Sequence, residues 1–309
     1  MFTGCGTAMV TSFRRDGSLD EQTLRNLVQR QIDGGIDFLV PCGTTGESPT
    51  LTREEHLRVV EITVDVAKRD ARSSGTHARV PVLAGAGGYN TAEVIALARE
   101  LATLGADGIL SVTPYYNKPT QEGLYQHYRA IAEAVALPIV LYSVQGRTGI
   151  NIEPATVKRL AEIENVVGLK EASGSIGQMA AILNMVPDSF IVLSGDDAIT
   201  LPLIALGGRG VISVVSNEIP AAMTQLARLA NEGNFAGARE IHRRYHPLME
   251  INFVESNPIP VKAAMAEMGL LEPAWRLPLV PPKAENAARI RAVLSSLGLT
   301  ERLHAAVSN

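Results

Sequence analysis

The chain has 309 residues, of which 46% are hydrophobic and 19% are charged. This composition can supply one large core or two ordinary ones, and it excludes a disordered or fibrous protein. Lys and Arg number 28 and Asp and Glu number 32, so the net charge of −4 excludes the strongly basic surface of a nucleic-acid-binding protein. We find no membrane-length apolar run and no signal-peptide pattern, and therefore expect a cytoplasmic protein with no membrane or nucleic-acid partner.

Eight short apolar runs rich in Val, Ile and Leu recur along the first two thirds of the chain. Each run is followed by turn residues and a helix-like stretch, and none shows the period-2 alternation of a half-exposed strand. Eight such units in about 215 residues predict a (β/α)8 TIM barrel. The runs span residues 6–10, 36–40, 80–85, 107–112, 137–142, 166–170, 190–195 and 210–215.

Helix signals separate these runs and then continue beyond them. A helix is predicted over 20–34, with an acidic first turn and a glycine pair at its end, and Thr52 with Glu55 fits a capping box. After residue 232 the strand signal stops, and three helices are predicted over 235–250, 259–269 and 284–297. We therefore expect a barrel domain over residues 1–232 and a C-terminal helical region over 233–309 that packs on the barrel.

The active site of a TIM barrel lies at the C-terminal ends of its strands, so polar residues at those ends are the first candidates. Lys170 is the only one of six lysines that closes an apolar run. A lysine desolvated at that position keeps more free amine, which can attack a carbonyl carbon and form a Schiff base. The alternative is a structural ion pair between Lys170 and Glu171.

Three further strand ends carry polar groups. Tyr142 ends the run next to that of Lys170, where its hydroxyl can relay protons or bond to a backbone acceptor. Thr44 and Thr45 lie in a glycine-bounded turn that can hold a small carboxylate, although such turns also occur without a ligand. Arg147 offers paired donors for a second carboxylate, or is a solvated loop residue.

Other features of the sequence predict structure more than chemistry. The two cysteines, Cys5 and Cys42, provide no disulfide framework and are expected to be small buried side chains. Asp196 and Asp197 are predicted to cap a helix, and no group of residues has metal-ligand spacing. The glycine-rich stretch 85–88 predicts a strand-to-helix turn, and the Arg-rich stretch 69–79 an exposed loop on the N-terminal face of the barrel.

Several motifs together resemble those of one known family. They are GTTGE at 43–47, TPYYNKP at 113–119, LY and GRTG within 141–149, GLKEASG at 168–174, SGDDA at 194–198, GGRGVISV at 207–214 and ESNPIPVK at 255–262. The sequence resembles the pyruvate-dependent class I aldolases, the family of N-acetylneuraminate lyase and dihydrodipicolinate synthase, and most closely the dihydrodipicolinate synthase branch. The resemblance implies a lyase that condenses pyruvate with L-aspartate 4-semialdehyde to 4-hydroxy-tetrahydrodipicolinate, in lysine and diaminopimelate biosynthesis.

The resemblance also implies roles for the matching residues. Lys170 would form the imine with pyruvate, and Thr44 and Thr45 would hold the pyruvate carboxylate. Tyr142 would shuttle protons through Thr44, and Tyr116 of a partner subunit would complete the relay. The family commonly forms a dimer of dimers, which implies a homotetramer, and it uses no metal or diffusible cofactor.

Other matching positions concern the second substrate and a regulator. Arg147 would bind the carboxylate of aspartate semialdehyde, and the backbone of Gly195 and Ile212 would line the pocket beside the lysine. Some relatives are inhibited by lysine in a pocket at the dimer interface, and the residues matching that effector site are Ser48, His56, Glu93 and Tyr115. Arg53 and Tyr89 stand where lysine-sensitive relatives often have other side chains.

The sequence departs from the family beside the fifth run, which leaves alternatives open. Ser143, Val144 and Gln145 replace the usual Asn-Val-Pro, so the loop that aims Arg147 lacks a rigid proline. One alternative is a related pyruvate lyase acting on a sialic acid or a 2-keto-3-deoxy sugar acid, and another is a non-catalytic barrel that binds a keto acid. Arg147 distinguishes the synthase from the sugar-acid lyase, because a polyhydroxylated acceptor needs hydroxyl-binding groups at this position instead of a cation.

Overall fold

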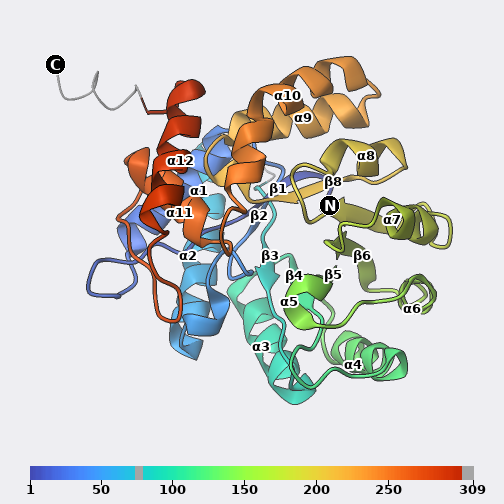
Figure 1. Cartoon of the computed structure of the whole chain (residues 1–309). Helices are drawn as coiled ribbons and strands as arrows, with labels where there is room; N and C mark the ends of the chain where they lie inside the picture. The colour runs from blue at the N-terminus through green and yellow to red at the C-terminus, as the bar shows by residue number, and fades with distance from the viewer. Residues whose placement is uncertain (74–78, 301–309) are drawn as a thin grey trace.

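A single eight-stranded parallel sheet forms the centre of the molecule. The computed structural model describes residues 1–73 and 79–300. The strand order is β2-β1-β8-β7-β6-β5-β4-β3, and a parallel bridge between Leu39 and Val82 brings the two outer strands together. Helices surround the strands (Figure 1). The architecture is a TIM barrel, and the predicted fold class is confirmed.

Each of the eight predicted runs overlaps one strand. The largest shift is in the first, which begins at Gly4 because Gly4 pairs with Gly210 of the last strand. The strands are β1 Gly4–Ala8, β2 Phe38–Val40, β3 Leu83–Gly85, β4 Gly108–Val112, β5 Ile139–Ser143, β6 Val166–Glu171, β7 Ile191–Ser194 and β8 Gly210–Ser213.

Helices occupy the connections between the strands, as expected. They are α1 Glu21–Asp33, η1 Ser48–Thr50, α2 Arg53–Ser73, α3 Thr91–Leu104, α4 Gln121–Ala134, α5 Gln145–Thr148, α6 Pro154–Leu160, α7 Ile176–Leu183, α8 Thr200–Ala205, η2 Val215–Asn217 and α9 Pro220–Asn231, where η marks a 3-10 helix. The capping box is confirmed, since Thr52 N donates to Glu55 at 3.0 Å and Glu55 N donates to the Thr52 hydroxyl at 3.2 Å.

One predicted loop is only partly a loop. The stretch 69–79 was expected to be exposed and irregular, but α2 continues to Ser73, because nothing before that residue breaks its helical pattern. Residues 74–78 lie outside the described part of the chain. The prediction for the two cysteines is confirmed, because Cys5 and Cys42 are both buried and free.

Two apolar layers stabilise the barrel. An outer layer packs the strands against the helices, and it includes Leu39, Ile109 and Leu169 from alternate strand positions. An inner layer fills the barrel itself and contains Phe2, Ala8, Phe38, Val40, Leu83, Leu110, Val140, Tyr142, Val144, Leu193 and Ile212. The barrel interior is therefore packed rather than open, and a ligand can reach only its mouth.

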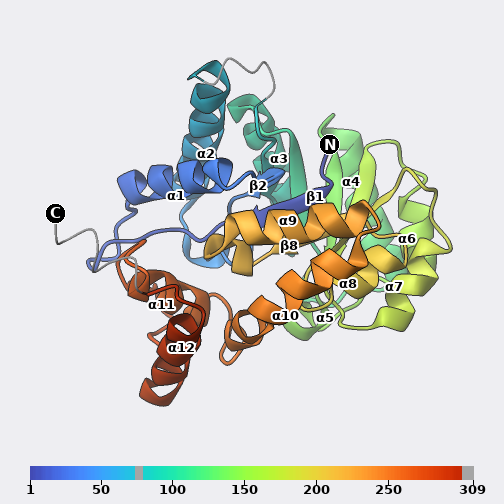
Figure 2. The same cartoon turned by 90° about the horizontal axis from the view of Figure 1, so that it is seen from above.

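The three helices predicted after residue 232 are confirmed as α10 Phe235–Ile251, α11 Ile259–Glu267 and α12 Ala284–Ser296. Their apolar side chains, such as Leu248, Val261 and Leu294, belong to the same buried cluster as the outer layer of the barrel. Figure 2 shows α11 and α12 at the end of the barrel where α5 follows β5. Within residues 1–73 and 79–300, no helix is long and apolar enough to cross a membrane.

Candidate active site

Lys170 and Tyr142 lie side by side at the carboxyl ends of β6 and β5. The parallel register pairs the two residues directly, and Nζ of Lys170 is 4.3 Å from the centroid of the Tyr142 ring. Lys170 is only 5% exposed. The structure thus brings the predicted nucleophile and the predicted proton relay together inside one apolar mouth.

Glu171 does not pair with the lysine that precedes it. Successive strand residues point to opposite faces of the sheet, and the Glu171 carboxylate accepts hydrogen bonds from Gln178 Nε2 at 2.8 Å and from Ser173 N. Burial raises the pKa of Glu171, while these hydrogen bonds oppose the rise. Among the described residues Lys170 forms no ion pair, so its amine faces the barrel mouth without a carboxylate partner.

Gly195, directly after β7, leaves room for the lysine side chain. A Cβ atom at this position would lie 3.1 Å from Cε of Lys170 and 2.6 Å from Cβ of Ala172. The Gly195 N–H donates to the carbonyl of Glu171 at 2.7 Å, which holds the two backbones together. Ile212 of β8 belongs to the inner apolar layer, and the register of β7 and β8 brings it level with Gly195.

The turn 43–47 follows β2 and is closed by its own backbone. The N–H groups of Gly46 and Glu47 donate to the carbonyls of Gly43 and Thr44. Thr45 is buried, and its hydroxyl accepts a hydrogen bond from Nδ2 of Asn257 at 3.0 Å, while Thr44 is half-buried. The turn therefore presents a threonine and backbone groups to the mouth, as a cradle for a small carboxylate requires.

Arg147 is held more firmly than its sequence suggested. Residues 145–148 form the short helix α5 without a proline, and Thr148 N donates to the carbonyl of Val144. Nη2 of Arg147 donates to the backbone carbonyl of Asn257 at 3.0 Å. The rest of the exposed guanidinium keeps donors free for an anionic ligand.

A cavity of about 370 Å³ opens at this end of the barrel. Its walls include Thr44, Tyr142 and Arg147, and the Tyr142 ring contacts the Lys170 amine, which is not itself a lining group. Three of the four residues matched to an effector site, Ser48, His56 and Tyr115, line this same cavity, and Glu93 does not. The active-site and effector candidates are therefore close neighbours in one chain.

Burial favours the neutral forms of both His56 and Tyr115. Nε2 of His56 lies 2.9 Å from the carbonyl of Gly85, and burial lowers the pKa of the imidazole. The Tyr115 ring packs edge-on against Tyr89 at 5.2 Å. Burial raises the pKa of Tyr115, and Tyr89 and Glu93 raise it further. Tyr116, by contrast, is 91% exposed in a left-handed backbone conformation and does not line the cavity.

Sequence reasoning missed the residues that hold the site from the C-terminal region. Asn257 donates to Thr45 and accepts from Arg147, and so it connects both predicted carboxylate sites. The motif ESNPIPVK contains this residue but gives no sign of what it contacts. The predicted helix cap was also wrong, because no side chain caps α8 at its N-cap residue Ile199. Asp196 accepts from Ala198 N in the preceding turn, and Asp197 accepts from Val214 N and Val215 N at the end of β8.

A buried lysine beside a tyrosine at the carboxyl ends of TIM-barrel strands is the arrangement of an imine-forming aldolase. The model of the Dihydrodipicolinate synthetase family matches residues 1–297, and the chain belongs to this family. A 4-hydroxy-tetrahydrodipicolinate synthase of Koribacter versatilis is 52% identical over 297 residues, which are 96% of each chain.

Solved structures of the family share the fold closely. Dihydrodipicolinate synthase from Aquifex aeolicus matches with a TM-score of 0.92 and 44% identity, covering 97% of this chain and 99% of that one. The enzyme from Cyanidioschyzon merolae, solved with lysine bound, matches with a TM-score of 0.90 and 41% identity, covering 96% and 99%. The predicted resemblance is confirmed over nearly the whole chain.

Proposed function

We propose that this chain condenses pyruvate with L-aspartate 4-semialdehyde to give 4-hydroxy-tetrahydrodipicolinate, the activity for which its relatives are named. The observation that carries the proposal is the buried Lys170, whose amine lies 4.3 Å from the Tyr142 ring with no carboxylate partner among the described residues. An amine in that setting is available to a keto acid that enters the cavity. The sugar-acid lyase and the keto-acid-binding barrel have no comparable support.

The reaction proceeds on the lysine. Nζ of Lys170 attacks the keto carbon of pyruvate, and loss of water gives an imine. The protonated imine withdraws electrons, so the methyl carbon loses a proton and becomes an enamine. We assign the transfer of these protons to the hydroxyl of Tyr142, whose ring contacts the amine.

The second half of the reaction joins the two substrates. The enamine carbon attacks the aldehyde carbon of aspartate semialdehyde, and the aldehyde oxygen takes up a proton. The amino group of the same substrate then attacks the imine carbon and displaces Lys170, which closes the ring. Because the imine itself serves as the electron sink, this chemistry needs no metal or diffusible cofactor.

Two carboxylates need two binding sites. We assign the pyruvate carboxylate to the turn that carries Thr44 and Thr45, and the semialdehyde carboxylate to Arg147. Both assignments agree with the contacts made by Asn257, which donates to Thr45 and accepts from Arg147. A guanidinium suits an anionic acceptor better than a polyhydroxylated one.

We also propose that the protein works as a homo-oligomer, in which Tyr116 of one subunit enters the site of its partner. The support is the exposure of Tyr116, which is 91% accessible while Tyr115 beside it is half-buried. We expect the dimer of dimers common in the family, which analytical ultracentrifugation would detect as a tetramer. The cytoplasmic location stays a prediction.

Lysine is the proposed effector, bound near Ser48, His56 and Tyr115, with Glu93 supplying a charge beside Tyr115. Arg53 donates to Glu100 at 2.9 Å, and the Tyr89 ring packs against the Tyr115 ring. Inhibition of turnover by millimolar lysine tests the assignment, and turnover insensitive to lysine rejects it.

The proposed activity has a direct test in two parts. Borohydride reduction with pyruvate traps an imine, and peptide mapping locates the adduct, which we expect on Lys170. Turnover of pyruvate plus L-aspartate 4-semialdehyde is then followed with a coupled reductase that consumes the cyclic product and a reduced nicotinamide. A trapped imine without turnover would reject the acceptor, and the absence of an adduct on folded protein would reject the enzyme.

A further inference from the structure

The turn that carries Thr44 and Thr45 ends at a residue in an unusual conformation. Glu47 has φ of 53° and ψ of 34°, the left-handed region that side chains other than glycine rarely adopt. The preceding Gly46 has no room for a side chain, since a Cβ there would lie 3.1 Å from Cys42 N and from Met9 O. Such a turn needs contacts from elsewhere in the fold to hold it.

Those contacts come from α11, more than two hundred residues along the chain. The Glu47 carboxylate is completely buried, and its Oε1 accepts a hydrogen bond from Nζ of Lys262, which is 0% exposed, at 2.5 Å. Nζ of Lys262 also lies 4.6 Å from the centroid of the Phe13 ring. Burial lowers the pKa of Lys262, and the charge of Glu47 opposes this.

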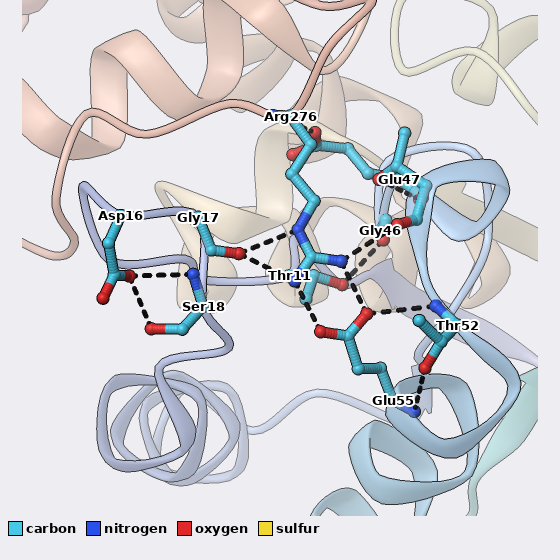
Figure 3. A network of polar contacts seen from close by, with 10 residues as sticks. Thr11, Asp16, Gly17, Ser18, Gly46, Glu47, Thr52, Glu55 and Arg276 are labelled. Atoms are coloured by element: carbon cyan, nitrogen blue, oxygen red, sulfur yellow. Dashed lines mark hydrogen bonds and ion pairs between the residues drawn. The ribbon is translucent and has the colours of Figure 1, made fainter.

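Arg276 completes the support on the other side of the turn. Its backbone N–H donates to Oε2 of Glu47 at 3.4 Å, and its guanidinium binds the Glu55 carboxylate and the carbonyl of Gly17. Figure 3 shows the Arg276 guanidinium between Gly17 and Glu55, with Glu47 close to the backbone of Arg276. With its own carboxylate partner in Glu55, Arg276 is not the main counter-charge of Glu47.

Two features connect this pair to the candidate site. Glu47 and Thr44 both line the cavity, so an unpaired carboxylate at Glu47 would repel an anionic ligand bound there. The segment that supplies Lys262 also supplies Asn257, which donates to Thr45. The turn is thus held at two points from one C-terminal segment.

We propose that Lys262 is a positioning residue for pyruvate. By binding Glu47 it fixes the turn 43–47 in the geometry that holds the substrate carboxylate, and it neutralises the anionic side chain at the base of that turn. This inference rests on the proposed function, because it requires that the turn binds pyruvate. It places part of the pyruvate site outside the barrel, in the C-terminal helical region.

The test compares K262M, E47Q and the double variant E47Q/K262M in the full-length protein. K262M removes the hydrogen bond and leaves a buried anion, so we expect KM for pyruvate to rise about tenfold or more, with a smaller change in kcat. E47Q keeps an oxygen that accepts from Nζ but removes the charge that strengthens this hydrogen bond, so its KM should rise by about threefold, less than that of K262M. The double variant leaves no unpaired anion, and its KM should lie at least about threefold below that of K262M.

The matched control is K283M, which replaces an exposed lysine at the start of α12 and should leave KM unchanged. A folded K262M with wild-type KM for pyruvate overturns the inference, and so does a double variant no better than K262M. If K262M fails to fold, the test rests on E47Q, and a folded E47Q with the wild-type KM for pyruvate overturns the inference, because the turn would then not depend on the ion pair. If borohydride traps no pyruvate adduct on the wild-type protein, the proposed function is overturned. If the wild type forms the adduct and K262M has the wild-type KM for pyruvate, only this inference is overturned.

Discussion

The end of β6 and the turn after β2 serve the same cavity, but different parts of the chain hold them. Lys170 is placed by its strand, by its register with Tyr142 and by the space left at Gly195. The turn 43–47 is placed by residues of the C-terminal region, through Asn257 and Lys262. The barrel strands alone therefore position Lys170, whereas the position of the turn 43–47 also depends on the C-terminal helical region.

This difference has a chemical reason. A lysine that attacks a carbonyl needs a free amine, so its surroundings are apolar and supply no carboxylate partner. A cradle for a carboxylate needs polar and backbone donors fixed in one geometry, and such groups are costly to bury unless each has a partner. The C-terminal segment provides those partners, and changes in the two regions should consequently affect different steps.

The largest effect should come from K170M, which removes the amine and keeps an unbranched side chain. We expect turnover to fall by a factor on the order of 10³ or more, with no borohydride adduct, because no other group can form the imine. Since Lys170 has no ion pair among the described residues, Tm should change little. K158M, on the exposed surface of α6, is the control. If K170M still forms the pyruvate adduct, at another lysine, then Lys170 is not the residue that forms the imine.

R147A should weaken the use of aspartate semialdehyde but not the binding of pyruvate. Loss of the guanidinium should lower kcat/KM for aspartate semialdehyde about a hundredfold, because a charge-assisted contact to its carboxylate disappears. Imine formation with pyruvate should remain. R228A, which breaks an exposed pair with Glu232, controls for the loss of a surface arginine. Normal turnover of R147A would show that the acceptor carboxylate binds elsewhere.

The sequence predicts the part of the site built by the barrel strands better than the part held by the C-terminal region. The position of Lys170 beside Tyr142 was predictable, because strand ends and parallel neighbours follow from the pattern of apolar runs. The contacts of Asn257 with Thr45 and of Lys262 with Glu47 join residues 212 and 215 positions apart, and no local pattern encodes them. Asp197 was misjudged for the same reason, since its partners Val214 and Val215 follow a different strand.

G195A tests the barrel side of the comparison with a single methyl group. A Cβ atom 3.1 Å from Cε of Lys170 would displace the amine, so we expect kcat to fall roughly thirtyfold while the fold persists. The control is G177A in α7, where the only neighbour of the added Cβ is Ser175 Oγ at 3.9 Å. Equal activity of the two variants would mean that the lysine tolerates displacement.

N257A tests the cradle side, and its effect should be the smallest. The variant removes the hydrogen bond to the Thr45 hydroxyl but keeps the backbone carbonyl that accepts from Arg147. We therefore expect KM for pyruvate to rise about tenfold, the scale of one lost buried hydrogen bond, while KM for aspartate semialdehyde changes little.

The control for this variant is N286A. Asn286 is another buried asparagine of the C-terminal region, and it does not line the cavity. Its side chain donates to Glu255 at 2.7 Å and accepts from Arg289 at 3.2 Å. N286A should therefore lose at least as much stability, measured as Tm, as N257A. If the C-terminal segment acts only through stability, the two variants will have the same KM for pyruvate. A rise in KM confined to N257A instead requires that the segment positions the turn 43–47, since N286A loses at least as many hydrogen bonds without touching that turn.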